Sequence, residues 1–152
     1  MATGKPRAGT PAIATGNVIR DSSMGLATQL IEGIVRLNDS VWRRNSVRLA
    51  LVEMLRLRNA RTVNCVFCKA ARYDVARQDG LTEDKVAQID DGFASSGLSE
   101  VEKLVLGFAD VYLRDPGQFD PQLIVRLREH FSAEQICHMA VALATFNASS
   151  KC

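Results

Sequence analysis

Residues 132–146 read SAEQICHMAVALATF, and this stretch decides the fold class. Ser132 and Gln135 have the spacing of a capping box, which marks the first turn of a helix. From residue 136 to residue 146 nearly every side chain is apolar, so we expect this helix to be buried on most sides. A small domain built around such a helix needs other elements to cover it.

Helix signals recur upstream of this stretch. Ser99 and Glu102 form a second capping box, and apolar side chains follow at helical spacing as far as Tyr112. Asp120-Pro121 pairs an N-cap residue with proline at the first helical position. Further helices are predicted over residues 47–61, from about residue 65 to the C′ glycine at residue 80, and after residue 82. No long stretch alternates with period two, so the sequence predicts an all-α helical bundle of six or seven helices.

The 152 residues fit one domain, and 47% hydrophobic with 24% charged residues excludes wholesale disorder. Residues 1–22 hold two of the four prolines and three of the ten glycines, without an apolar period. This composition predicts a flexible N-terminal arm over 1–22 and a single all-helical domain over 23–152.

The balance of 19 Lys and Arg against 17 Asp and Glu gives a net charge of +2. That value is too small to favour a nucleic acid or a membrane as a partner. The longest unbroken apolar run, Met139 to Ala144, is far shorter than a membrane span, and no signal peptide is visible. We therefore expect a cytoplasmic protein with its cysteines kept as thiols.

Cys65-Val66-Phe67-Cys68 is the main chemical signal. With Asn64 as the N-cap, Cys65 would lie in the first turn of a helix running to about Asp79. Cysteines at i and i+3 share one helix face, and the helix N-terminus stabilises a thiolate. A vicinal dithiol suits thiol–disulfide or peroxide chemistry, in which one thiolate attacks and the other thiol resolves the product.

Two cations follow the cysteines at helical spacing. Lys69 lies four residues after Cys65 and Arg72 four residues after Cys68, so each is expected to lean toward its own sulfur and stabilise a thiolate. Two other interpretations compete for Cys65 and Cys68: they could form half of a zinc site, or they could be small core residues. The sequence offers no second ligand pair, so no metal and no cofactor is predicted.

Glu53 is a carboxylate within the apolar run from Leu49 to Leu55. It could be a base with a raised pKa, or the partner of Arg56 or Arg48 in an ion pair. Taken alone, its surroundings favour the ion pair. The other candidates are interpreted as packing, interface or surface residues: Trp42, Phe67, Cys137 and His138 in the core or an interface, His130 and Cys152 at the surface.

Glu53, a gap of eleven residues and Cys65-x-x-Cys68 together resemble the alkylhydroperoxidase D-like branch of the carboxymuconolactone decarboxylase family. The similarity extends over residues 52–58, 76–82, 98–102 and 127–132, and covers roughly residues 40 to 148. It implies an alkylhydroperoxidase D-like helical bundle that assembles as a homo-oligomer, as a dimer, trimer or hexamer.

The resemblance also implies a function, namely an antioxidant peroxidase-like thiol oxidoreductase. Its substrate would be a small hydroperoxide, and its reductant a dithiol carried by a lipoylated or thioredoxin-like protein. Carried over by position, Cys68 is the attacking thiolate, Cys65 the resolving thiol and Glu53 the base at the head of a proton relay.

The sequence departs from the family at two positions. Arg72 occupies the place of a relay histidine, and Phe67 that of a histidine sometimes found before the second cysteine. A guanidinium stabilises a thiolate but does not shuttle a proton near neutral pH, so the resemblance predicts weakened turnover. The alternative is a non-catalytic helical oligomer that uses the same scaffold for binding or assembly.

Overall fold

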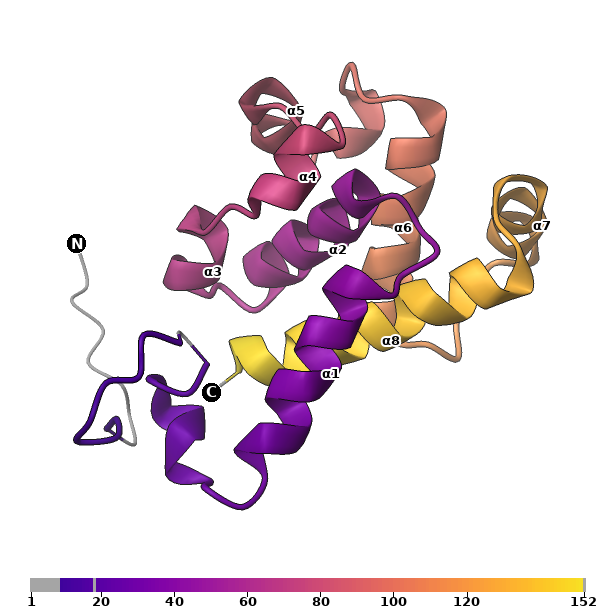
Figure 1. Ribbon diagram of the computed structural model, residues 1–152. Helices are drawn as coiled ribbons and strands as arrows, with labels where there is room; N and C mark the ends of the chain where they lie inside the picture. Colours follow the sequence, from indigo (N-terminus) through magenta and orange to yellow (C-terminus); the bar gives the residue numbers. More distant parts are fainter. Residues whose placement is uncertain (1–8, 18, 152) are drawn as a thin grey trace.

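The computed structural model describes residues 9–17 and 19–151, which form eight α-helices and two 3₁₀ turns and contain no strand. The predicted all-α fold is therefore confirmed (Figure 1). The single helix expected between residue 65 and residue 79 is divided into two short ones. The α-helices are α1 (Ile31–Arg43), α2 (Leu49–Thr62), α3 (Val66–Ala70), α4 (Asp74–Gln78), α5 (Glu83–Ala87), α6 (Glu100–Arg114), α7 (Pro121–His130) and α8 (Ala133–Ser150).

Of the predicted N-terminal arm, residues 1–8 and 18 lie outside the described residues. The Asp21 carboxylate accepts hydrogen bonds from the backbone N–H groups of Thr15 and Gly16, at 2.7 and 2.9 Å. Ser22 then caps the 3₁₀ turn Ser23–Leu26. This part of the arm is thus held in local turns.

The helix starts follow the local signals. Ser99 and Ser132 each form a complete capping box, and Asp120 caps α7 in front of Pro121. Gly80 has φ +96°, and the N–H groups of Gly80 and Leu81 close the end of α4 on the carbonyls of Arg77 and Ala76. That conformation suits glycine because it has no Cβ to clash.

Helix α2 is the centre of the bundle (Figure 1). It packs against α6 and α8 over most of its length and against α3 and α4 on a further side. Because it is surrounded, every residue from Ala50 to Ala60 is buried, including charged ones. The long helices thus form a scaffold around α2, and the short helices α3 and α4 lie against it.

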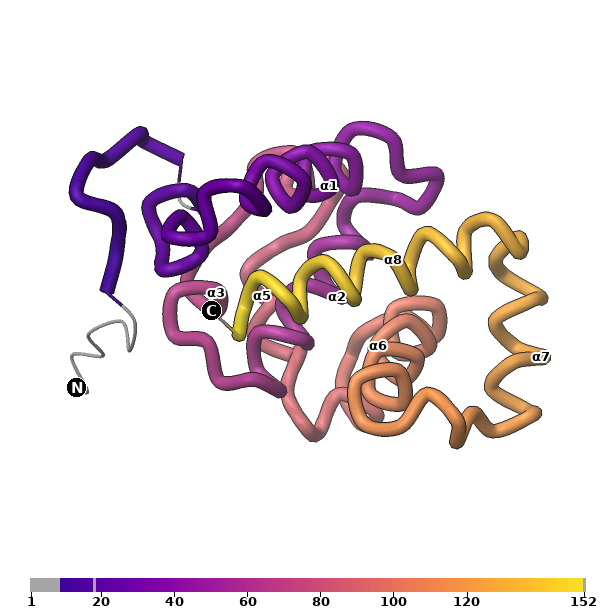
Figure 2. Tube along the Cα trace, turned by 90° about the horizontal axis from the view of Figure 1, so that it is seen from below, coloured from indigo at the N-terminus to yellow at the C-terminus, as the bar shows by residue number. Residues whose placement is uncertain are grey.

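Helix α8 runs between α1 on one side and α6 on the other, and α7 links the far ends of α6 and α8 (Figure 2). Its inner face is buried, with Met139 and Leu143 fully enclosed. Its outer face exposes Cys137, Val141 and Ala144. The expectation of burial on most sides is therefore wrong for this face, because within one chain the packed helices cover only the inner side.

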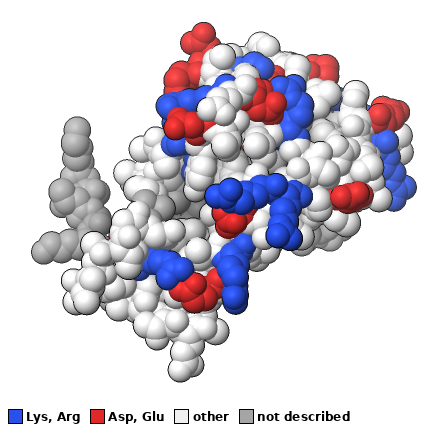
Figure 3. Space-filling model, viewed as in Figure 1, with Lys and Arg blue, Asp and Glu red and all other residues white. Residues whose placement is uncertain are grey.

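Acidic and basic side chains are intermixed over α4 and α5 in Figure 3. Near the start of α1, Glu32 forms an ion pair with Arg20. Within residues 9–17 and 19–151, no helix combines the length and the hydropathy that crossing a bilayer would require.

Candidate active site

The end of α2 places the first cysteine. The Asn64 N–H donates to the carbonyl of Arg61 and the Cys65 N–H to that of Ala60, at 3.1 and 2.9 Å, which is the paired pattern of a Schellman motif. Asn64 has φ +55°, a left-handed conformation that asparagine tolerates better than most residues. Asn64 therefore ends α2 and is not the predicted N-cap of the next helix.

Cys65 is itself the N-cap of α3, and its sulfur accepts the backbone N–H of Cys68 at 3.2 Å. Cys65 and Cys68 are joined in a disulfide, with their Cα atoms 5.3 Å apart. The predicted proximity of the two cysteines is thus confirmed, whereas the expectation that the cysteines are thiols is wrong for this pair. Helix α3 has only five residues and stops at Ala71, where the backbone becomes extended.

Val66 and Phe67, between the cysteines, are 71% and 60% exposed, so Phe67 is not the packing residue that was predicted. Both cysteines are partly buried. The disulfide thus lies at the edge of the domain with two apolar side chains directed to solvent. Cys137, expected in the core, is a free and exposed thiol on the outer face of α8.

Glu53 and Arg56 form a buried ion pair on α2 beneath α3. The Nε and Nη2 groups of Arg56 each donate to a different carboxylate oxygen of Glu53, both at 2.6 Å. The Glu53 side chain is completely buried and that of Arg56 is 7% exposed. The ion pair favoured from the surroundings of Glu53 is therefore confirmed, with Arg56 and not Arg48 as its partner.

The titration of Glu53 reflects two opposing effects. Burial raises the pKa of Glu53 above its ordinary value, while hydrogen bonds and charge from Arg56 act in the opposite direction. The backbone N–H of Tyr73 and the more distant charge of Arg72 also oppose the rise in the pKa of this carboxyl. The role of Glu53 as a catalytic base stays a prediction.

Lys69 and Arg72 bond elsewhere than their spacing predicts. The Lys69 ammonium donates to Asn64 Oδ1 at 2.7 Å. The Arg72 Nε donates to Glu83 at 3.2 Å, and its Nη1 donates to the carbonyls of Lys69 and Ala71, at 2.7 and 2.8 Å. Among the described residues neither cation donates to a sulfur: Lys69 bonds to Asn64, and Arg72 lies beyond the end of α3. Their role in stabilising a thiolate stays a prediction.

The stacked rings of Trp42 and Tyr73, here called the aromatic wall, lie beside the ion pair. Tyr73 stacks on Trp42 with ring centroids 4.2 Å apart, and the Arg56 guanidinium lies over the Tyr73 ring at 5.3 Å. Trp42 packs as predicted and also contacts Phe146. Its buried indole nitrogen has no hydrogen-bond partner among the described residues. The wall fixes the start of α4 against α1 and α2.

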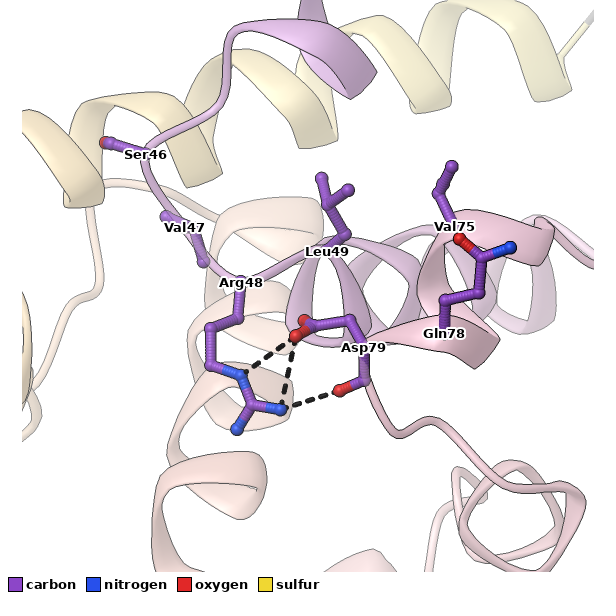
Figure 4. A pocket seen from close by; sticks show the side chains of 7 residues that line it. All are labelled: Ser46, Val47, Arg48, Leu49, Val75, Gln78 and Asp79. Atoms are coloured by element: carbon purple, nitrogen blue, oxygen red, sulfur yellow. Dashed lines mark hydrogen bonds and ion pairs between the residues drawn. The ribbon is translucent and has the colours of Figure 1, made fainter.

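A solvent-open depression of about 470 Å³ lies away from the cysteines, at the start of α2 (Figure 4). Across it the Arg48 side chain bonds to Asp79, whose other carboxylate oxygen accepts the Ala50 N–H at 2.9 Å. Beside it His138 Nδ1 accepts the Ser46 N–H at 3.0 Å, and the His138 side chain is half-buried. Its lining residues are Ser46, Val47, Arg48, Leu49, Val75, Gln78 and Asp79.

The contact between Arg56 and the segment that carries the cysteines was not identified from the sequence. Arg56 entered only as a partner for Glu53, yet it also donates to the carbonyls of Cys68 and Ala71. Its position three residues after a carboxylate, in an otherwise apolar run, is the signal that marks it. Within residues 9–17 and 19–151, no group of three or more His, Cys, Asp or Glu side chains could hold a metal ion.

Comparison with known proteins places the fold. No protein-family model matches the chain, and none of the curated proteins matches it. A solved structure of a protein of unknown function from Agrobacterium tumefaciens, proposed there to be the antioxidant defence protein AhpD, superposes with a TM-score of 0.73. The two are 22% identical, and the match covers 84% of this chain and 87% of the other. The chain therefore has the helical fold of this AhpD-like structure, as the resemblance predicted.

Proposed function

We propose that the chain is a dithiol peroxidase that reduces hydroperoxides through Cys65 and Cys68. The observation that carries this proposal is the disulfide between the two cysteines, at the edge of the domain. The fold shared with a protein proposed to serve antioxidant defence supports the same conclusion. A disulfide that spans four residues and lies near solvent is accessible to a reductant.

The reaction needs three balanced steps. The Cys68 thiolate attacks a hydroperoxide oxygen, the O–O bond breaks, and a sulfenic acid and an alcohol result after the alkoxide takes up a proton. The Cys65 thiol then displaces water from that sulfenic acid and forms the disulfide. An external dithiol reduces the disulfide by exchange and is itself oxidised to a disulfide.

The test is steady-state consumption of cumene hydroperoxide with dithiothreitol as the reductant. The unaltered protein should turn over many times, whereas Cys68→Ser should lose the activity. Cys65→Ser should accumulate a sulfenic acid on Cys68 that a dimedone probe traps. Cys137→Ser removes the exposed thiol of α8 and should retain full turnover.

Consumption that stops after one equivalent, or that depends on Cys137, would contradict the proposal. An oligomer without turnover would favour the alternative, a non-catalytic assembly of the same fold. Cytoplasmic location and a lipoylated or thioredoxin-like donor stay predictions beside this proposal.

A further inference from the structure

Helix α3 is too short to be stabilised by its own backbone hydrogen bonds. A helix leaves its last four carbonyls without partners inside the helix, and α3 has five residues in all. The carbonyls of Cys68 and Ala71 accept hydrogen bonds from Arg56 of α2, and those of Lys69 and Ala71 accept from Arg72, just after the helix. The conformation of the segment that carries the disulfide thus depends on side chains outside it.

Arg56 supplies two of these bonds from the buried side. Its Nη1 donates to the Cys68 carbonyl at 2.7 Å and its Nη2 to the Ala71 carbonyl at 2.8 Å. Arg72 Nη1 also donates to the Ala71 carbonyl, at 2.8 Å. Cationic donors are favourable at carbonyls that end a helix. Arg56 and Arg72 therefore both donate to the carbonyl group of Ala71, at the end of α3.

Glu53 fixes Arg56 in this position. Its two oxygens engage the guanidinium in the planar fork arrangement, which defines the direction of the remaining N–H groups. The backbone N–H of Tyr73, just beyond α3, favours the charged form of the same carboxylate and so opposes the rise in its pKa. The two bonds from Arg56 thus tie the end of α3 to the buried helix α2.

We propose that Glu53 and Arg56 act together as a positioning pair, which holds the Cys68 carbonyl so that the two sulfurs stay within bonding reach when the disulfide is reduced. This inference rests on the proposed function and deepens it. Glu53 then acts on the thiols through Arg56 and the backbone, not by accepting a proton from them. Holding two reacting groups in place raises their effective concentration, which favours the disulfide.

The test is the equilibrium with glutathione, in which the protein disulfide and two reduced glutathiones give the dithiol and one oxidised glutathione. In Arg56→Lys and in Glu53→Gln the equilibrium constant for forming the disulfide should be about tenfold lower than in the unaltered protein. A change of this size is expected for the loss of hydrogen bonds to a charged group. The double variant should fall no further than either single variant, because the two side chains act as one unit.

Arg58→Lys is the matched control. Arg58 is also buried on α2 and also ion-paired, but its partners are Asp91 and Asp110, away from α3. Its glutathione equilibrium should stay within about twofold of the unaltered protein, even where its stability falls. The dependence of Cys68 alkylation on pH should keep its shape in Glu53→Gln, since the carboxylate that is removed does not accept the Cys68 proton in this proposal.

An equilibrium unchanged in Arg56→Lys, or changed equally in Arg58→Lys, would overturn the proposal. So would a Glu53→Gln variant that slows peroxide reduction and alters the pH profile with an unchanged glutathione equilibrium, because that is the signature of a base. Failure to consume peroxide would reject the proposed function alone, since the equilibrium needs no peroxide.

Unaltered protein provides a second measurement in case the variants do not fold. The Arg56 Nε–H resonance in a ¹⁵N NMR spectrum should exchange slowly with water in the oxidised and the reduced states, because both retain the bond to Glu53. Rapid exchange in the reduced protein would show that the pair releases when the thiols form, contrary to the proposal.

Discussion

Arg58 is the second buried arginine of α2. Its guanidinium donates to both oxygens of Asp110 at 2.6 and 2.9 Å, pairs with Asp91 at 2.9 Å, and lies over the Phe93 ring at 5.2 Å. It therefore joins α2 to α6 and to the loop before α6. Removing Arg58 leaves Asp110, whose side chain is 19% exposed, without its close partner, and a largely buried charge without its partner is costly.

We predict that Arg58→Ala lowers the free energy of unfolding by about 3 kcal/mol, measured by urea titration. Arg114→Ala is the matched control, because Arg114 also approaches Asp110, at 3.9 Å, but is 73% exposed. Its effect should be below about 0.5 kcal/mol. Equal losses in the two variants would contradict the importance assigned to the buried pair.

Glu53 gives a pH-dependent prediction. Because burial raises the pKa of this carboxyl in the folded state, the folded protein binds more protons here than the unfolded chain does. The contribution of Glu53 to stability is then fully present below its unfolded value of about 4.5 and is lost as the pH rises through the folded pKa.

The difference in unfolding free energy, unaltered protein minus Glu53→Gln, should accordingly fall as the pH rises from about 4 to about 7. Urea titrations at several pH values measure it. A difference that grows with pH would mean that Arg56 lowers the folded pKa of Glu53 more than burial raises it.

At the scale of the elements, the helix starts were predictable and the division between α3 and α4 was not. Capping boxes and the C′ glycine involve neighbours in sequence, so Ser99, Ser132 and Gly80 could be assigned without the fold. The break after α3 depends on Tyr73 stacking against Trp42 and on the arginine bonds, which join residues far apart in sequence.

The same distinction applies to the candidate site. The Cys65–Cys68 pair and the carboxylate of Glu53 were evident from spacing and from the resemblance. The predicted direction of Arg72 assumed one continuous helix, whereas α3 ends before it, and Lys69 bonds to Asn64 instead of a sulfur. Asn64 was predicted as a helix start, but the backbone bonds at the end of α2 make it part of a helix end.

Helix α6 offers the test of a local signal. Ser99→Ala removes the hydroxyl that accepts the Glu102 N–H, so we predict a loss of about 1 kcal/mol in the free energy of unfolding. Ser95→Ala, an exposed position in the 3₁₀ turn just before, is the control and should change little. Equal unfolding curves for Ser99→Ala and the unaltered protein would show that packing alone fixes the start of α6.

At the scale of the whole molecule, the outer face of α8 bears on assembly. Val141 is 47% exposed there, and Leu37 of the neighbouring α1 is 45% exposed. Apolar side chains gathered on adjoining helices are typical of a subunit contact. The homo-oligomer expected from the sequence and from the resemblance stays a prediction, and this face is where we expect its contact.

Val141→Glu should therefore reduce the mass measured by light scattering to that of one 16.7 kDa chain. Val125→Glu alters a valine of α7 that is 58% exposed and should leave the mass unchanged. A monomeric mass for the unaltered protein at micromolar concentration would reject the prediction.

Val66 and Phe67 are the two residues of the disulfide segment that face solvent, while the residues that hold this segment are buried in α2. Variation at these two positions leaves the contacts of Glu53 and Arg56 untouched. An engineer who wishes to change the oxidising power of the centre can randomise both together without rebuilding the core. Natural selection has the same freedom, so this dipeptide is where descendants of the chain can diverge in redox behaviour while keeping one architecture.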